Sequence, residues 1–240
     1  MTSTYPHIIA HRCGGALAPE NSLEGLRIAA RLGCRGVEFD VMLSADGIPL
    51  LIHDETLERT TTGTGHVAEL TARAIRQFDA GGPHHPAFAV APAPTFSDAM
   101  TCCEELGLWT NIEIKPATGH ESETGAIVGR WLADNWNGHG VVSSFSTLAL
   151  TAAQQVASNL PCAMLVESLP ADWQTQMHAL HANAVHLAAR FVTDKEAAAL
   201  KEISWACYTV NQRPEGDRLF ALGCHALFTD RPDLWTMGEM

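Results

Sequence analysis

The chain has 240 residues, and 46% of them are hydrophobic, which is enough for the core of one large α/β domain. Its formal net charge is −12, from 15 basic and 27 acidic residues, and this acidity argues against a nucleic-acid partner or general affinity for anionic membranes. No apolar run reaches the roughly 18 residues that a transmembrane helix needs, so we expect no integral membrane segment. Seven cysteines without a CxxC spacing, and an N-terminus without a signal-peptide pattern, predict reduced thiols and a cytoplasmic location.

Apolar β-rich segments alternate along the chain with Ala/Leu-rich segments of helical spacing. Strands are expected at 7–12, 36–43, 48–53, 108–115, 141–145, 162–167, 184–188, 204–210 and 226–229, and helices at 22–32, 95–106, 121–136, 147–157 and 193–202 among others. This alternation predicts βαβ units and a parallel sheet. If the segment at 48–53 is a hairpin partner of the strand before it, eight units remain, which predicts a (β/α)8 TIM barrel. A doubly wound open sheet is the alternative, but such a sheet seldom spreads charged residues over so many strand ends.

The segment 54–94 breaks the alternation. It follows the second strand and contains a Thr/Gly-rich run at 60–65, one short helical pattern at 69–78 and a Gly/Pro/His stretch at 81–86. We expect it to be a small insertion on the loop side of the barrel, within a single domain that covers 1–240.

Charged residues recur on one face of otherwise apolar strands. Glu38 and Asp40 are two residues apart in one strand, and Glu113 and Lys115 are two residues apart in another, so each pair points to one side. Such charges are unfavourable in a core unless they are paired, bind a cation or take part in catalysis. Three converging carboxylates would repel one another, and one hard divalent cation, Mg²⁺ or Ca²⁺, would neutralise them through oxygen ligands.

Two further strands end in histidine, at His11 with its neighbour Arg12 and at His53. The unperturbed pKa of histidine is about 6.5, so these side chains can donate and accept protons. Arg12 can bind an oxyanion through its planar donors, and Lys115 adds a point charge. A cation, two cationic side chains and two histidines together suit displacement at a phosphoryl group.

Several ordered blocks between about residue 7 and 233 resemble the glycerophosphodiester phosphodiesterase family. They are His11-Arg12-Cys13-Gly14, Pro19-Glu20-Asn21-Ser22, Glu38-Phe39-Asp40-Val41, His53-Asp54-Glu55-Thr56-Leu57-Glu58-Arg59-Thr60-Thr61, Glu113-Ile114-Lys115-Pro116, Ser143-Ser144-Phe145, Thr209-Val210-Asn211 and Thr229-Asp230-Arg231-Pro232-Asp233. Each block alone is a moderate signal, whereas the ordered set is strong.

The resemblance implies a barrel with an insertion after the second strand, and metal-dependent hydrolysis of small-molecule glycerophosphodiesters to sn-glycerol 3-phosphate and an alcohol. By motif position, it implies metal ligation by Glu38, Asp40 and Glu113, acid–base catalysis by His11 and His53, and phosphate binding by Arg12 and Lys115. We expect His11 to activate the attacking oxygen and His53 to protonate the leaving alcohol.

Four other positions have two alternative roles each. Glu20 would support the site near the metal or the substrate hydroxyls, although a loop or capping role is an even alternative. Phe145 and Tyr208 are strand residues for which core packing is the default and lining of the substrate pocket is the alternative. For His186 there are likewise two alternatives, contact with the substrate and a place in the core.

Three positions depart from the family pattern, one of them conservatively, with Ser22 in place of the usual threonine. Cys13 stands where the family usually has glycine, so its side chain could crowd the first loop, and Tyr208 stands where tryptophan is common. A lipid-cleaving relative, phospholipase D-like or phosphoinositide-cleaving, and a non-catalytic phosphate-binding barrel are the alternative functions. The sequence makes no prediction of oligomeric state.

Overall fold

The computed structural model describes residues 5–235, and within them eight parallel strands close into a barrel. Because β1 pairs with both β9 and β2, the ring has no open edge, and the predicted TIM barrel is confirmed. The strands are β1 (Ile8–Ala10), β2 (Gly36–Leu43), β4 (Trp109–Ile114), β5 (Gly140–Ser144), β6 (Cys162–Val166), β7 (Ala184–Ala188), β8 (Ser204–Tyr208) and β9 (Ala226–Thr229).

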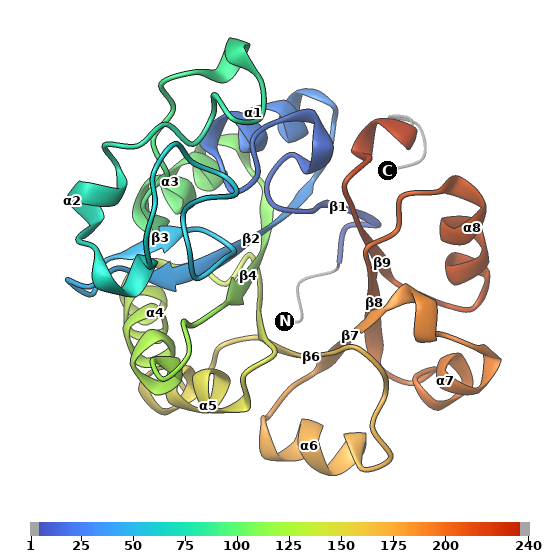
Figure 1. Cartoon of the computed structure of the whole chain (residues 1–240). Helices are drawn as coiled ribbons and strands as arrows, with labels where there is room; N and C mark the ends of the chain where they lie inside the picture. The colour runs from blue at the N-terminus through green and yellow to red at the C-terminus, as the bar shows by residue number, and fades with distance from the viewer. Residues whose placement is uncertain (1–4, 236–240) are drawn as a thin grey trace.

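Helices cover the outside of this ring (Figure 1). Ser22 illustrates why they begin where they do, since its hydroxyl accepts a hydrogen bond from the amide of Gly25 at 3.0 Å. Thr95 and Thr193 form capping boxes in the same way for later helices. The helices are α1 (Leu23–Arg31), α3 (Phe96–Leu106), α4 (Glu121–Asn135), α5 (Thr147–Val156), α6 (Trp173–Ala179), α7 (Asp194–Ala199) and α8 (Arg213–Ala221), with short 3-10 turns at Gly15–Leu17, Ala189–Phe191 and Pro232–Leu234. No helix among residues 5–235 is long and apolar enough to cross a membrane.

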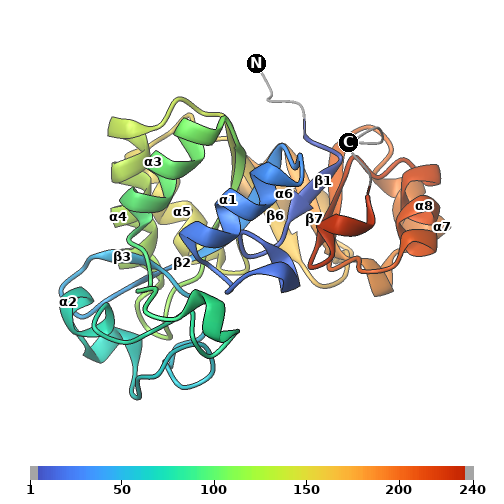
Figure 2. The same ribbon diagram turned by 90° about the horizontal axis from the view of Figure 1, so that it is seen from above.

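The short strand β3 (Pro49–Leu51) is the hairpin partner of β2 and lies outside the ring. Gly47 makes the intervening turn with a φ of 71°, a conformation that glycine adopts without strain. The insertion segment, residues 54–94, follows and contains α2 (Ala72–Ile75) and the 3-10 turns Val67–Glu69 and Pro86–Phe88. It packs on a small apolar cluster of its own with β2 and β3, on the side of the barrel that Figures 1 and 2 show in cyan to green.

One apolar cluster inside the barrel is rich in small side chains. It includes one alanine from each of β6 to β9, namely Ala163, Ala184, Ala206 and Ala226. The ring of Tyr5 fills the space that these alanines leave, and its centroid lies 4.9 Å from that of Trp109. The Tyr5 hydroxyl lies 2.9 Å from Nε2 of His186, which is completely buried. This packing closes one end of the barrel and leaves the carboxyl ends of the strands for the charged residues.

Candidate active site

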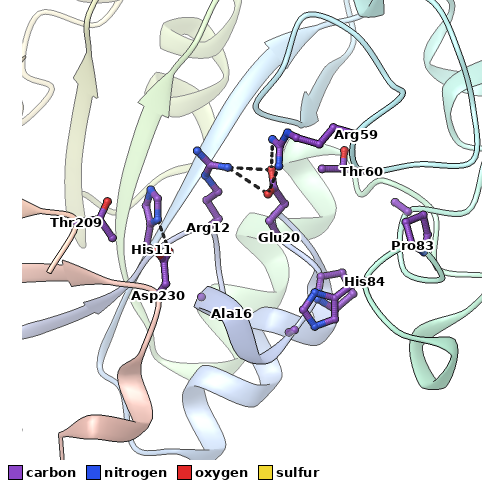
Figure 3. A pocket seen from close by; sticks show the side chains of 14 residues that line it. His11, Arg12, Ala16, Glu20, Arg59, Thr60, Pro83, His84, Thr209 and Asp230 are labelled. Atoms are coloured by element: carbon purple, nitrogen blue, oxygen red, sulfur yellow. Dashed lines mark hydrogen bonds and ion pairs between the residues drawn. The ribbon is translucent and has the colours of Figure 1, made fainter. Parts of the chain in front are cut away.

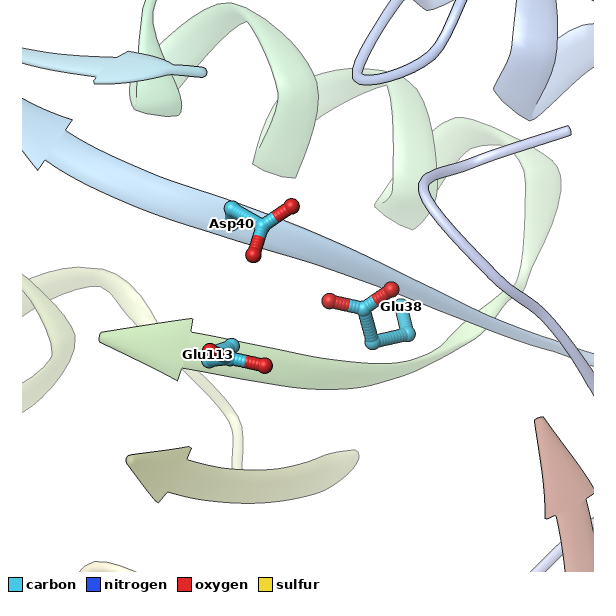
Figure 4. Close-up of side chains that lie close together, drawn as sticks. All are labelled: Glu38, Asp40 and Glu113. Atoms are coloured by element: carbon cyan, nitrogen blue, oxygen red, sulfur yellow. The ribbon is translucent and has the colours of Figure 1, made fainter. Parts of the chain in front are cut away.

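β2 and β4 bring three carboxylates together inside the barrel (Figure 4). Parallel pairing sets Asp40 beside Glu113, and two residues earlier along each strand it sets Glu38 beside Asn111. One oxygen from each of the three carboxylates lies within 4.8 Å of the others. The alternation of side chains along the two strands therefore turns all three acids to one shared face.

The electrostatics of this carboxylate cluster favour a bound cation. Burial, together with the charge of Asp40, raises the pKa of Glu38 to about 7 and that of Glu113 to about 8. Lys115 Nζ lies 3.4 Å from an oxygen of Glu113 and 3.7 Å from one of Asp40, so it offsets only part of the negative charge. Oε1 of Glu38 is buried and has no hydrogen-bond partner. An all-oxygen donor set with one unpartnered buried oxygen fits a hard divalent cation.

Both histidines have their Nδ1 atom engaged with an aspartate. His11 Nδ1 lies 2.7 Å from Asp230, whose other oxygen accepts a hydrogen bond from Asn211 Nδ2 at 2.8 Å. His53 Nδ1 is bonded in the same way to its neighbour Asp54. These contacts orient each ring and leave Nε2 as the nitrogen available for proton transfer.

Arg12 and Glu20 belong to an ion-pair network beside the cluster. Arg12 Nη1 lies 3.1 Å from Glu20, and the Arg12 amide donates a 2.8 Å hydrogen bond to Glu38. Arg59, from the insertion segment, donates through its two Nη atoms to Glu20 at 2.7 and 2.9 Å and also to Asp54. Glu20 is therefore a partner of two arginines, and it lies outside the set of three converging carboxylates.

A cavity of about 350 Å³ contains the carboxylate cluster, both histidines, Arg12 and Lys115. Phe145 and Tyr208 form one wall with their rings perpendicular and their centroids 6.0 Å apart, and Lys115 Nζ lies 5.9 Å from the Phe145 ring. His186 also borders this cavity, although burial lowers its pKa to about 3 and keeps it neutral. The structure thus gathers all eleven candidate site residues named from the sequence around one cavity or its adjoining ion-pair network.

Sequence reasoning assigned no role to three residues of this site. They are Asp54 and Asp230, which orient the histidines, and Arg59, which bridges Asp54 and Glu20. All three lie in motif blocks that carry the family resemblance. For Asp54 there was a local signal, because a carboxylate directly after a strand-end histidine is placed to bond its ring.

Cys13 does not reach the site. It adopts a φ of 75°, in the left-handed region that glycine favours, and its side chain is fully buried in the main core. Its Cβ faces Gly25 of α1, and a Cβ atom added to that glycine would lie only 2.9 Å from it. Burial raises the pKa of the Cys13 thiol well above its ordinary value, so the thiol stays protonated.

Comparison with known proteins places these features in one family. The family model of the glycerophosphoryl diester phosphodiesterase family matches residues 11–234. A glycerophosphodiester phosphodiesterase of Caldanaerobacter subterraneus subsp. tengcongensis is 28% identical over 235 residues, which cover 94% of each chain.

Solved structures agree. A phosphodiesterase of Oleispira antarctica, determined in complex with the product sn-glycerol-3-phosphate, is 31% identical with a TM-score of 0.92, over 95% of this chain and 94% of that one. A glycerophosphodiester phosphodiesterase of Agrobacterium tumefaciens is 26% identical with a TM-score of 0.76, over 96% of this chain and 98% of that one. With a match that spans nearly the whole barrel and its charged strand ends, the chain belongs to the glycerophosphoryl diester phosphodiesterase family.

Proposed function

We propose that this protein hydrolyses glycerophosphodiesters to sn-glycerol 3-phosphate and an alcohol, with one divalent cation. The observation that carries the proposal is the convergence of three carboxylates, with oxygens within 4.8 Å, in the same cavity as two aspartate-oriented histidines. The similar Oleispira antarctica protein, whose structure contains sn-glycerol-3-phosphate, supports the choice of substrate class.

Glu38, Asp40 and Glu113 would hold the cation. When bound, it would neutralise the phosphate charge and polarise a phosphoryl oxygen. Both Mg²⁺ and Ca²⁺ accept carboxylate oxygens, and we propose one of these two rather than zinc, because the converging ligands are all oxygens.

The remaining charged side chains would bind and protonate the substrate. Arg12 and Lys115 border the same cavity and would hold the phosphate, Arg12 with its planar fork and Lys115 as a point charge. Hydrolysis breaks the bond from phosphorus to the alcohol oxygen, so the attacking oxygen loses a proton and the alcohol gains one. His11 and His53 would make these two transfers through Nε2, which for His11 lies 3.8 Å from an oxygen of Glu38. Phe145 and Tyr208 would cover the carbon chain of the glycerol.

We propose a small-molecule substrate, with no nucleic-acid partner, because the net charge of −12 repels polyanions outside the local cationic site. We also propose a cytoplasmic location, since all seven cysteines are free thiols in the structure, as is usual in a reducing compartment.

The test is release of glycerol 3-phosphate from glycerophosphocholine and glycerophosphoglycerol by metal-stripped protein, with Mg²⁺, Ca²⁺ or Mn²⁺ then added back. Activity restored by one of these ions, and absent from a folded Glu38→Gln variant, is the expected result. Glu202→Gln is the matched control, because Glu202 is exposed and far from the carboxylate cluster in the fold. A folded protein that binds a diester but cleaves none with any ion would instead be a phosphate-binding barrel.

A further inference from the structure

A second cavity, larger than the one that contains the carboxylate cluster, lies beside it. It measures about 620 Å³ and is bounded by the loop after β1, the insertion segment and the loops after β8 and β9 (Figure 3). This outer cavity shares three lining residues, His11, Arg12 and Thr209, with the 350 Å³ cavity. A diester whose phosphate contacts Arg12 can therefore extend from one cavity into the other.

The geometry points to the outer cavity as the binding site for the alcohol part of the diester, with a preference for a polyol such as glycerol or inositol. This inference rests on the proposed function and names its preferred substrate class. The volume lies within the roughly 300–1,000 Å³ of typical small-molecule sites.

Uncommitted hydrogen-bonding groups on opposite walls support a polyol. The side chains of Thr60, His84 and Thr209 line the cavity, and none of them has a hydrogen bond to another residue among those that the structure describes. Figure 3 shows Thr209 on the His11 side and His84 on the far side, next to Pro83 of the insertion segment. Because the three groups come from separate parts of the chain, they could contact several hydroxyls of one ligand at once.

The carboxylates of the outer cavity are already occupied. Glu20 is paired with Arg12 and Arg59, and Asp230 with His11 and Asn211. A cationic alcohol such as choline would therefore find no unpaired anion among these residues. A quaternary ammonium also prefers aromatic faces, and no Phe, Tyr or Trp is among the described residues that line this cavity.

An acyl chain has little surface to pack on. The apolar lining consists of small residues from the first loop and the insertion segment, namely Ala16, Ala18, Pro19, Ala80 and Pro83. The larger apolar rings, Phe145, Tyr208 and Phe228, border the other cavity. The outer cavity therefore suits a compact, hydroxyl-rich group better than a lipid tail.

The first measurement compares kcat/KM for glycerophosphoglycerol, glycerophosphoinositol and glycerophosphocholine with the cation-loaded protein. We expect the two polyol diesters to exceed glycerophosphocholine by about tenfold, as expected for two or three hydrogen bonds of modest strength. Equal or better turnover of glycerophosphocholine would overturn the polyol inference and leave the proposed function intact.

A Thr60→Val variant removes one of the three hydrogen-bonding groups at nearly constant volume. We expect about a threefold to tenfold lower kcat/KM for polyol diesters and no change for glycerol 3-(4-nitrophenyl phosphate), which carries no polyol leaving group. Thr64→Val is the matched control, since Thr64 is exposed in the same segment and does not line the cavity. An equal loss for all substrates would mean that Thr60 acts structurally and would count against the inference.

Binding measured without turnover separates the two proposals. A His53→Gln variant loaded with Mg²⁺ is titrated calorimetrically with each diester, and it keeps every side chain that lines the outer cavity, because His53 is not one of them. Glycerophosphoglycerol should bind this variant about tenfold more tightly than glycerophosphocholine. If wild-type protein then cleaved neither diester, that result would refute the proposed hydrolysis and leave the polyol site standing. Equal binding, or no binding of either diester, would refute the polyol site.

Discussion

The site has two halves that are built differently. The carboxylate cluster lies on strands, where the pairing of Asp40 with Glu113 in the β2–β4 register fixes its geometry. The histidines depend on loops, since His11 is oriented by Asp230, 219 residues away, and His53 by an aspartate that Arg59 holds. The strand half is positioned by backbone hydrogen bonds, whereas the loop half is positioned by ion pairs between side chains. Variants can therefore test how much activity depends on the strand-borne carboxylates and how much on the ion pairs that position the histidines.

The largest effect is expected from the strand half. Glu113→Gln should lower kcat/KM by about a thousandfold, because a cation that stabilises the transition state by several kcal/mol loses one of its ligands. The same change should stabilise the metal-free protein by about 1 kcal/mol, because it removes a buried carboxylate whose pKa burial and Asp40 raise to about 8. Steady-state kinetics at saturating cation measure the loss of kcat/KM. Urea unfolding in the presence of a chelator measures the stability of the metal-free protein. Loss of both activity and metal-free stability would contradict this account.

A smaller effect is expected from the loop half. Arg59→Ala should lower kcat by about ten- to a hundredfold with the fold intact, because Asp54 and Glu20 lose their shared partner and both His53 and Arg12 lose alignment. Arg59→Lys should recover only part of the loss, since lysine cannot bridge both acids with paired donors. Arg76→Ala, which breaks the exposed pair with Asp98, is the control. A purely structural Arg59 would lower the melting temperature and leave kcat unchanged.

This contrast also explains what could be predicted from the sequence. The barrel and the acids at positions 38, 40 and 113 follow from strand periodicity, which needs only local sequence. The partnership of His11 with Asp230, and that of Glu20 with Arg59, joins segments far apart in the chain. No local pattern encodes such pairs, so their roles appeared only when the loops were placed. The outer cavity could not be predicted from the sequence for the same reason, because four separate loops form it.

Within the loop half, the two histidines differ from each other in the direction in which their pKa is shifted. Burial alone would lower the pKa of His11, but its bond to Asp230 and the charge of Glu38 leave that pKa raised. For His53, burial outweighs Asp40 and Asp54 and lowers the pKa. We propose the reverse of the order expected from sequence, with His11 as the proton donor to the alcohol, because His11 lines the outer cavity and His53 does not.

Activated substrates decide between the two orders. Nitrophenolate leaves without a proton, so a His11→Gln variant should lose about a hundredfold or more on glycerophosphoglycerol and less than about tenfold on glycerol 3-(4-nitrophenyl phosphate). His53→Gln should lose activity on both substrates. The opposite pattern would support the order expected from sequence, with His53 as the acid.

Metal binding should depend on pH. The pKa values of Glu38 and Glu113, about 7 and 8 against an ordinary 4.5, mean that the folded metal-free protein binds more protons than the unfolded chain between about pH 4.5 and 8. Its stability therefore falls as pH rises through that window. A cation binds the deprotonated carboxylates, so its Kd rises as the pH falls. At one fixed concentration, about one hundred times the Kd measured at pH 8, the cation should raise the melting temperature by about 5–10 °C at pH 8 and by much less at pH 5.5. The same rise in melting temperature at pH 8 and at pH 5.5 would contradict the assignment of the carboxylates as cation ligands.

The smallest effect is expected at Cys13, which belongs to neither half. Its left-handed φ of 75° costs an L-residue about 1–2 kcal/mol, while its buried sulfur contributes packing of similar size. Cys13→Gly should therefore change stability by no more than about 1 kcal/mol, and kcat/KM by less than twofold. Cys13→Ala loses the sulfur but keeps the strain, so it should be no more stable than the glycine variant. If glycine proved the less stable of the two, packing of the Cβ atom against Gly25 would outweigh backbone strain at this position.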